Sequence, residues 1–364
     1  MTVRASQRIS SLGGYAFAEV DKIVNDLKAQ GVDVIDFGVG DPRAPTPPLV
    51  REAGQAAIDL HRCSGYPSYI GSSGFRAAVA AWIGRRFGVA VDPERHVTAT
   101  IGSKEAVFHA PFAFVDPGDV VISPDPGYPP YARGTLFAGG TSYRYPVLPG
   151  ALPDLGAIPD DVLARTKMLW LCYPNSPTGD VATLDFYREA AALCRKHDIL
   201  LCSDEAYSEI WFGEEPPVSA LQAGLDNVLA FFSMSKRSAM TGWRCGYVVG
   251  HADAVAVFRK LKTNIDSGTP DFGRAAAVAA LADESHVEEM RAEYRHKRDV
   301  MCDAFVAAGL PDCRPPATMY VWQQTPPGMS AEEFAKRLLD PSIAIVTTPG
   351  TWLSAARGAG DPGE

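Results

Sequence analysis

Residues 228–250 read VLAFFSMSKRSAMTGWRCGYVVG, and this stretch is the most informative part of the chain for the fold. It contains two short apolar segments, VLAFFSM (228–234) and CGYVVG (245–250), which are apolar on both faces. Such segments are typical of strands that are buried between two layers of helices. Lys236 follows the first of these predicted strands, and Arg244 precedes the second.

The chain before residue 228 shows the same alternation of short buried strands and helices. Further strands are predicted at VTATI (97–101), DVVIS (119–123), MLWLCY (168–173) and ILLCSDE (199–205). Helices are predicted over residues 19–30, 74–87 and 183–197. This order of elements predicts an α/β domain with a mainly parallel central sheet.

The pattern changes after residue 250, where longer and more charged helices begin. A long helix is predicted over 286–309, followed by a strand over 318–324, a helix over 330–340 and a strand over 343–348. We therefore predict a large domain at 41–250 and a smaller α/β domain formed by 1–40 together with 251–364. The tail RGAGDPGE closes no element, so we expect the chain to be cut short at its C-terminus.

Composition excludes several classes of function. The 364 residues carry a formal net charge of −9 without a basic cluster, which disfavours nucleic acid as a partner. No apolar run is long enough to span a bilayer, and the first ten residues do not resemble a secretory signal. The seven cysteines form no Cys-x-x-Cys pair and no cluster at metal-ligand spacing, so we predict no metal site and a cytoplasmic location.

Ligands of open α/β sheets bind beyond the carboxyl ends of the strands, so the residues that follow each predicted strand are the candidates for chemistry. Ser103 follows the first strand and could cap a helix whose free N–H groups favour a phosphate. Asn175 lies in a Pro- and Gly-containing turn after the third strand. Most such residues only cap helices or form turns, so neither is specific alone.

The fourth and fifth strands end in ionisable residues. Asp204 closes ILLCS where burial is expected, and a buried carboxylate needs a cationic partner, which could be a structural Arg or Lys. Tyr207 lies within reach of the same region. Lys236, next to Ser233, Ser235 and a second cation, is a candidate for a lowered pKa and a nucleophilic amine, although a lysine after a strand is more often a surface residue.

Taken together, these residues resemble those of the class I/II aminotransferases, which are fold-type I enzymes that depend on pyridoxal 5′-phosphate (PLP). The resemblance runs from about residue 9 to about residue 353 and rests on an ordered set of motifs. These motifs are DFGVGDP, YPSYIGSSGFR, GSKEA, DPGYPPY, YPNSPTG, SDEAY and SMSKRSAMTGWRCGY.

The resemblance implies a catalytic role for three of these side chains. Lys236 would bind PLP covalently and move the proton at the substrate α-carbon. Asp204 would pair with the protonated pyridine nitrogen, and Tyr207 would donate a hydrogen bond to the phenolic oxygen. Asn175 would share that oxygen, and Tyr128 would stack on the ring.

The remaining implied roles concern the phosphate, the substrate and a partner subunit. The phosphate would be held by Ser103, Lys104, Ser233 and Arg244. Gly40 would line the pocket for the substrate carboxylate, with Asn175 and Tyr128 also facing the substrate. Tyr66 would reach a phosphate across a two-fold interface, which implies a homodimer with shared active sites.

One departure from the family concerns the substrate α-carboxylate, which the family binds with an arginine on a late strand. The chain ends at Gly363-Glu364 where that strand should begin. Arg357 lies in the Gly-rich tail and does not match the motif, so we treat it as a surface residue. We expect PLP binding to survive this loss and catalysis to be impaired, because the substrate would be poorly oriented.

Within the family, the segments SKRSAMTGWR, GSKEA and GGYAFAEVDKIVNDLKAQGVDVIDFGVGDP resemble most the diaminopimelate-pathway aminotransferases, of the LL-diaminopimelate and N-succinyl-diaminopimelate types. Aspartate, alanine, methionine or aromatic aminotransferases are alternatives, because a few pocket side chains set the substrate. A PLP-dependent C–S lyase shares Lys236, Asp204 and Tyr207. A non-catalytic PLP-binding regulator is disfavoured because no basic extension precedes residue 40, and a Rossmann dehydrogenase because Gly-x-Gly-x-x-Gly is absent after a strand.

Overall fold

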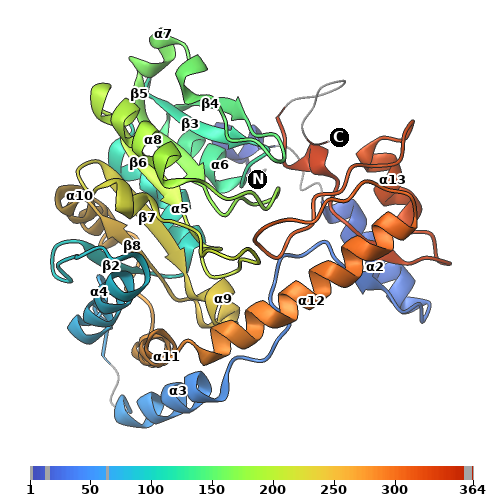
Figure 1. Ribbon diagram of the computed structural model, residues 1–364. Helices are drawn as coiled ribbons and strands as arrows, with labels where there is room; N and C mark the ends of the chain where they lie inside the picture. The colour runs from blue at the N-terminus through green and yellow to red at the C-terminus, as the bar shows by residue number, and fades with distance from the viewer. Residues whose placement is uncertain (1–2, 13–16, 63–64, 356–362, 364) are drawn as a thin grey trace.

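The centre of the molecule is a seven-stranded sheet with the strand order β2-β8-β7-β6-β5-β3-β4 (Figure 1). The structure is a computed structural model that describes residues 3–12, 17–62, 65–355 and 363. The strands are β2 (Val97–Thr100), β3 (Val120–Asp125), β4 (Thr141–Pro146), β5 (Thr166–Cys172), β6 (Leu200–Asp204), β7 (Val228–Ser233) and β8 (Gly246–Gly250). Only β8 is antiparallel to its neighbours β2 and β7, which confirms the predicted α/β class with a mainly parallel sheet.

Helices cover both faces of this sheet, and the strand residues alternate between the two layers. Trp170 and Cys172 of β5 pack in one apolar cluster with α5, α6 and α10. Leu169 and Leu171 pack in the other cluster, with α4, α8 and α11. Burial on both faces explains why the strands are continuously apolar. These helices are α4 (Ser73–Phe87), α5 (Ser103–Phe114), α6 (Pro130–Ala138), α8 (Leu184–Lys196), α10 (Ala252–Lys262) and α11 (Asp271–Ala282).

The other helices are shorter or lie outside these two layers. The α-helices are α1 (Gln7–Ser10), α2 (Phe17–Ala29), α3 (Pro48–Leu60), α7 (Asp160–Leu163), α9 (Met234–Arg237), α12 (Ser285–Ala307) and α13 (Ala331–Leu338). The 3₁₀ turns are η1 (Leu155–Ala157), η2 (Ala220–Ala223), η3 (Thr241–Trp243) and η4 (Gly350–Trp352). Within the described ranges, no helix has the length and apolar character needed to cross a membrane.

A second, two-stranded sheet joins the two ends of the described chain. Strand β1 (Ile35–Asp36) pairs in parallel with β9 (Ile345–Val346). Residues 35–36 therefore lie beside residues 345–346. Helices α10 and α11 also follow residue 250, but they lie elsewhere. Helix α10 contacts α5 and β8, and helix α11 contacts α3 and α4. The domain boundaries stay a prediction.

Two sequence expectations about strands need correction. The segment 318–324 is not a strand, because Thr318 has a φ of 70° that turns the backbone out of the extended conformation. Only an isolated bridge between Trp211 and Ala317 remains there. Strand β4 was not predicted, because at the sheet edge its sequence TSYRYP is only partly buried and lacks the apolar run of the central strands.

Trp82 is the side chain whose truncation should destabilise this fold most clearly. It is 1% exposed and packs edge-on against Phe232 and Tyr247, with ring centroids 5.9 and 6.2 Å away. Trp82→Ala should lower the free energy of unfolding by about 3–5 kcal/mol, measured by urea denaturation. Val257→Ala, at a side chain that is 43% exposed, is the control and should change it by about 0.5 kcal/mol or less. A loss below about 1 kcal/mol for Trp82→Ala would contradict this packing.

Candidate active site

The parallel register of the sheet brings the predicted catalytic residues to one edge. Cys172 at the end of β5 pairs with Asp204 at the end of β6, and Asp204 pairs with Phe231 of β7. Asn175 and Lys236 follow β5 and β7 directly. These residues therefore lie at or just beyond the carboxyl ends of neighbouring strands, at the edge where the sequence predicted the ligand-binding residues.

Asp204 is a buried carboxylate that has no cationic partner among the residues that the structure describes. It is 4% exposed, and its oxygens accept hydrogen bonds from the Tyr131 hydroxyl at 2.9 Å and from the Ala206 N–H at 3.3 Å. Burial raises its pKa to about 6, although both hydrogen bonds oppose that shift. In the described part of the chain no Lys, Arg or His forms an ion pair with it, so a structural ion pair does not explain its burial. A cationic ligand group would compensate the charge.

Lys236 lies in α9, a single turn that begins directly after β7. Ser233 caps this turn, because its hydroxyl accepts a hydrogen bond from the Ser235 N–H at 3.2 Å. The Lys236 amine donates a hydrogen bond to the Gly40 carbonyl. Burial lowers the pKa of Lys236, and the nearby Arg244 lowers it further, whereas Asp41 raises it. The net direction increases the fraction of neutral, nucleophilic amine.

Asn175 and Tyr207 are both buried beside this edge. The Asn175 amide nitrogen donates to the Cys172 carbonyl at 3.1 Å, and its side-chain oxygen accepts from the Thr178 hydroxyl at 3.0 Å. An amide nitrogen has two N–H groups, so Asn175 has a second donor for a ligand. The Tyr207 hydroxyl is hydrogen-bonded to the Tyr320 hydroxyl at 2.7 Å.

Tyr128 lies between β3 and α6 and faces the same group of charges. Its ring packs edge-on against that of Tyr131, with centroids 5.9 Å apart. Burial raises the pKa of the Tyr128 phenol, Asp204 adds to the rise, and Arg244 opposes it. The phenol is therefore neutral, and its ring contributes an apolar surface close to the Asp204 carboxylate.

An anion cradle is formed where α5 begins beside Arg244. Gly102, with a φ of 72°, precedes the helix, and no side chain caps the first N–H groups. A Cβ at Gly102 would lie 2.3 Å from an Arg244 guanidinium nitrogen, so only glycine allows this approach. Arg244 has a φ of 52° and donates to the Thr241 carbonyl at 2.8 Å. Free helix N–H groups beside a guanidinium are a typical phosphate site.

The expectation that Ser103 caps α5 is wrong. Gly102 occupies the N-cap position, because its positive φ makes the turn into the helix, and Ser103 is the first helical residue. Ser103 is nevertheless the first residue of α5, so its backbone N–H and hydroxyl lie at the anion cradle. The Lys104 side chain is exposed, and the described hydrogen bonds and ion pairs include none from it to the other site residues.

One predicted residue stands apart from this group. The Tyr66 side chain is 86% exposed and contacts no other predicted site residue of its own chain through any described hydrogen bond. Arg357 lies outside the described residues.

Sequence reasoning missed three residues that contribute to the site. Tyr131 donates to Asp204, and its signal was the second tyrosine of the DPGYPPY motif. Asp41, from the DFGVGDP motif, has a buried carboxylate oxygen that forms no hydrogen bond within the described part of the chain. Tyr320 was assigned to a strand, and no local pattern indicated that its hydroxyl would meet that of Tyr207.

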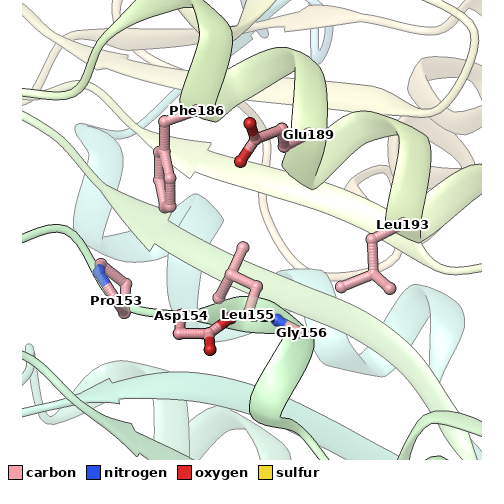
Figure 2. A pocket seen from close by; sticks show the side chains of 7 residues that line it. All are labelled: Pro153, Asp154, Leu155, Gly156, Phe186, Glu189 and Leu193. Atoms are coloured by element: carbon pink, nitrogen blue, oxygen red, sulfur yellow. Dashed lines mark hydrogen bonds between the residues drawn. The ribbon is translucent and has the colours of Figure 1, made fainter.

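A separate surface pocket lies between η1 and α8 (Figure 2). Its volume is about 310 Å³, and its lining includes the carboxylates of Asp154 and Glu189 beside Phe186 and Leu193. The Asp154 carboxylate already accepts a hydrogen bond from the Gly156 N–H at 2.9 Å. None of the lining residues belongs to the site at the sheet edge, so this pocket plays no part in the proposed chemistry.

The buried Asp204 makes the stability of the cofactor-free protein depend on pH. The pKa of Asp204 is about 6 in the folded state, whereas its ordinary value is 3.8. The folded protein therefore loses stability as pH rises from 3.8 to about 6, because the unfolded chain ionises this carboxyl group more readily. Asp204→Asn should therefore raise the free energy of unfolding by roughly 2 kcal/mol at pH 8, and by much less at pH 4.5. Urea unfolding at both pH values measures this. The exposed Asp226→Asn is the control, and an equal effect of Asp204→Asn at both pH values would contradict the prediction.

Comparison with known proteins agrees with this geometry. The family Aminotransferase class I and II matches residues 32–358. The LL-diaminopimelate aminotransferase of Desulforudis audaxviator is 44% identical over 356 residues, which cover 96% of this chain and 91% of that protein.

Two solved structures share the fold along nearly the whole chain. Apo-BacF from Bacillus subtilis has a TM-score of 0.92 at 31% identity, covering 98% of this chain and 92% of that one. A probable N-succinyldiaminopimelate aminotransferase from Thermus thermophilus has a TM-score of 0.87 at 31% identity, covering 93% and 92%. The chain therefore belongs to the class I and II aminotransferases and is an enzyme of the transaminase type.

Proposed function

We propose that this enzyme uses PLP to move an amino group between LL-diaminopimelate and a 2-oxo acid such as 2-oxoglutarate. The substrate class is supported by several relatives that are named LL-diaminopimelate aminotransferase and are 41–44% identical over nearly the whole chain. The observation that carries the cofactor assignment is the buried Asp204 carboxylate, which lacks a cation in the described structure and lies at the same sheet edge as the Lys236 amine. A cytoplasmic location stays a prediction.

The residues at the sheet edge fit the charged groups of PLP. When bound, PLP supplies a protonated pyridine ring that accepts the electron pair of the substrate α-carbon. Asp204 would hold the proton on the ring nitrogen, which would also compensate its own burial. Tyr128 would cover one face of the ring, and Asn175 and Tyr207 would donate hydrogen bonds to the phenolic oxygen.

The anion cradle fits the phosphate of the same cofactor. Arg244 would donate two parallel hydrogen bonds, because its guanidinium is fixed against Gly102 and the Thr241 carbonyl. Ser103 and Lys104 would contribute the first N–H groups of α5, and Ser233 its hydroxyl. The exposed Lys104 side chain is not required for this role.

Lys236 would act as the acid and base of the reaction. Its amine extends from one turn of helix and donates a hydrogen bond to the carbonyl of Gly40, the residue that would line the pocket for the substrate carboxylate. The lowered pKa lets the amine take the proton from the substrate α-carbon and return it to the acceptor carbon. Gly40, Asn175 and Tyr128 would contact the substrate.

We also propose a homodimer with shared active sites. Tyr66 is 86% exposed, and exposed apolar side chains lie on both sides of it in the sequence and on the neighbouring helix α11. These are Ile58, Leu60, Tyr69 and Phe272, with exposed fractions of 54%, 79%, 39% and 39%. A second copy of the chain would cover this surface, and its Tyr66 would donate to the phosphate.

A half-reaction scan tests the proposed substrate and the catalytic lysine together. Protein loaded with PLP is mixed separately with LL-diaminopimelate, its N-succinyl form, glutamate, aspartate, alanine, methionine and phenylalanine. LL-diaminopimelate and glutamate should each convert the visible absorbance band of the lysine-bound cofactor into that of its amine form. Lys236→Ala should lack the lysine-bound band, whereas the exposed Lys260→Ala should retain it.

Each part of this scan can fail independently. Conversion by aspartate or alanine but not by LL-diaminopimelate would refute the substrate class and keep the transaminase. A normal lysine-bound band in Lys236→Ala would refute the site. Release of pyruvate without a 2-oxo acid acceptor would indicate lyase chemistry instead.

Mixing two impaired variants at a limiting PLP concentration tests whether Tyr66 acts in the partner's site. Tyr66→Phe should weaken PLP binding by roughly 10-fold or more, because a hydrogen bond to a charged group is lost. A heterodimer of Tyr66→Phe with Lys236→Ala would contain one site with an intact Lys236 and the intact Tyr66 of its partner. Unfolding and refolding the two together should therefore restore part of the activity. No recovery, in dimers confirmed by light scattering, would mean that Tyr66 does not reach across.

A further inference from the structure

Tyr320 and Tyr207 form a pair of buried phenols at the site. Their hydroxyl oxygens are 2.7 Å apart, and their rings meet edge-on with centroids separated by 5.4 Å. Tyr207 follows β6, whereas Tyr320 belongs to the segment between α12 and α13. The hydrogen bond therefore connects two parts of the chain that are more than a hundred residues apart.

The backbone around Tyr320 is fixed against the segment that follows Tyr207. The Phe212 N–H donates to the Pro316 carbonyl, and the Thr318 N–H donates to the Ile210 carbonyl, both at 2.8 Å. On its other side the segment lies against the turn of Asn175, because a Cβ at Gly179 would be 2.5 Å from Pro315. Tyr320 is thus held by contacts with both loops that carry the predicted donors to the cofactor's phenolic oxygen.

The Tyr320 hydroxyl also faces Gly40. A Cβ at Gly40 would lie only 2.2 Å from it, so glycine is required for this packing. The Gly40 carbonyl accepts the hydrogen bond of the Lys236 amine. The Tyr320 hydroxyl therefore contacts the expected hydrogen-bond donor Tyr207 and lies against Gly40, the residue whose carbonyl holds the expected base.

The direction of the hydrogen bond between Tyr207 and Tyr320 depends on which hydroxyl has a proton left to donate. A phenol has one O–H donor, and its oxygen can accept as well. If Tyr207 donates its only proton to the phenolic oxygen of the cofactor, it can only accept from Tyr320. We propose that Tyr320 is a positioning residue, which donates to Tyr207 and so directs the Tyr207 proton toward the cofactor.

This inference rests on the proposed PLP function and adds a role that acts through Tyr207. A hydroxyl that accepts a hydrogen bond becomes a stronger donor, because consecutive hydrogen bonds polarise one another. Tyr320 thereby stabilises negative charge on the cofactor's phenolic oxygen. Stabilisation of that charge favours the deprotonated state of the lysine-linked cofactor at lower pH.

The test is the pH midpoint of the visible absorbance change of the PLP-loaded protein without substrate. Tyr320→Phe should move this midpoint upward by about 0.3 to 1 pH unit, the shift expected for the loss of one weak hydrogen bond. In a Tyr207→Phe background, Tyr320→Phe should cause no further shift. Tyr294→Phe is the matched control, because Tyr294 packs in the same apolar cluster and no described hydrogen bond joins it to Tyr207. It should leave the midpoint unchanged.

A second measurement tests the contact itself in the absence of cofactor. Urea unfolding of the single and double variants should show that the combined loss of stability is smaller than the sum of the two single losses. These curves also establish that Tyr320→Phe is folded. Additive losses would show that the two hydroxyls are not coupled and would overturn the proposal.

The spectral outcomes separate this proposal from the proposed function. A midpoint that does not move in Tyr320→Phe, or that moves equally with and without the Tyr207 hydroxyl, would refute the positioning role and leave the PLP site intact. Absence of a lysine-bound band in the unmodified protein would refute the cofactor assignment and, with it, this role.

Discussion

The side chain of Asp204 is an ionisable carboxyl group in a residue that is only 4% exposed. The described chain gives it hydrogen bonds but no cation. The cost of burying this charge is the constraint around which the site is arranged. Protonation in the absence of a ligand relieves the cost, which is why the pKa rises to about 6. In the proposed PLP-loaded enzyme a protonated ring nitrogen would relieve it, which would couple cofactor binding to the stability of this sheet edge.

The sheet supplies the rigidity that such a site needs. Parallel neighbours β5, β6 and β7 bring Asn175, Asp204 and Lys236 to one edge of the sheet, because the strand registers are fixed by backbone hydrogen bonds and by burial on both faces. The anion cradle is built differently, from two residues with positive φ. Gly102 and Arg244 adopt this conformation next to each other, and the close approach of the guanidinium leaves no room for a Cβ at position 102.

The segment that contains Tyr320 connects the sheet edge with the substrate side of the site. Its backbone pairs with residues 210–212, and the Tyr320 hydroxyl meets Tyr207 and Gly40.

Two carboxylates of the site have opposite surroundings. Asp204 accepts hydrogen bonds, whereas Asp41 has a buried oxygen that no described residue hydrogen-bonds, and its charge raises the pKa of the Lys236 amine. Under the proposed function, this difference in environment would separate Asp204, which would hold the proton of the cofactor, from Asp41, which would influence the base.

The sequence by itself determined the α/β class, the central strands and the order of the polar strand ends. Apolar runs such as VLAFFS and the residues that follow them are local features, and the carboxyl ends of parallel strands always share an edge. Only the tertiary structure decided the partners of Asp204, the N-cap of α5, and the positions of Tyr131, Asp41 and Tyr320. Thr318 illustrates the reason. Its positive φ interrupts the predicted strand 318–324 at its first residue, and its N–H donates to the carbonyl of Ile210, which lies far away in the sequence.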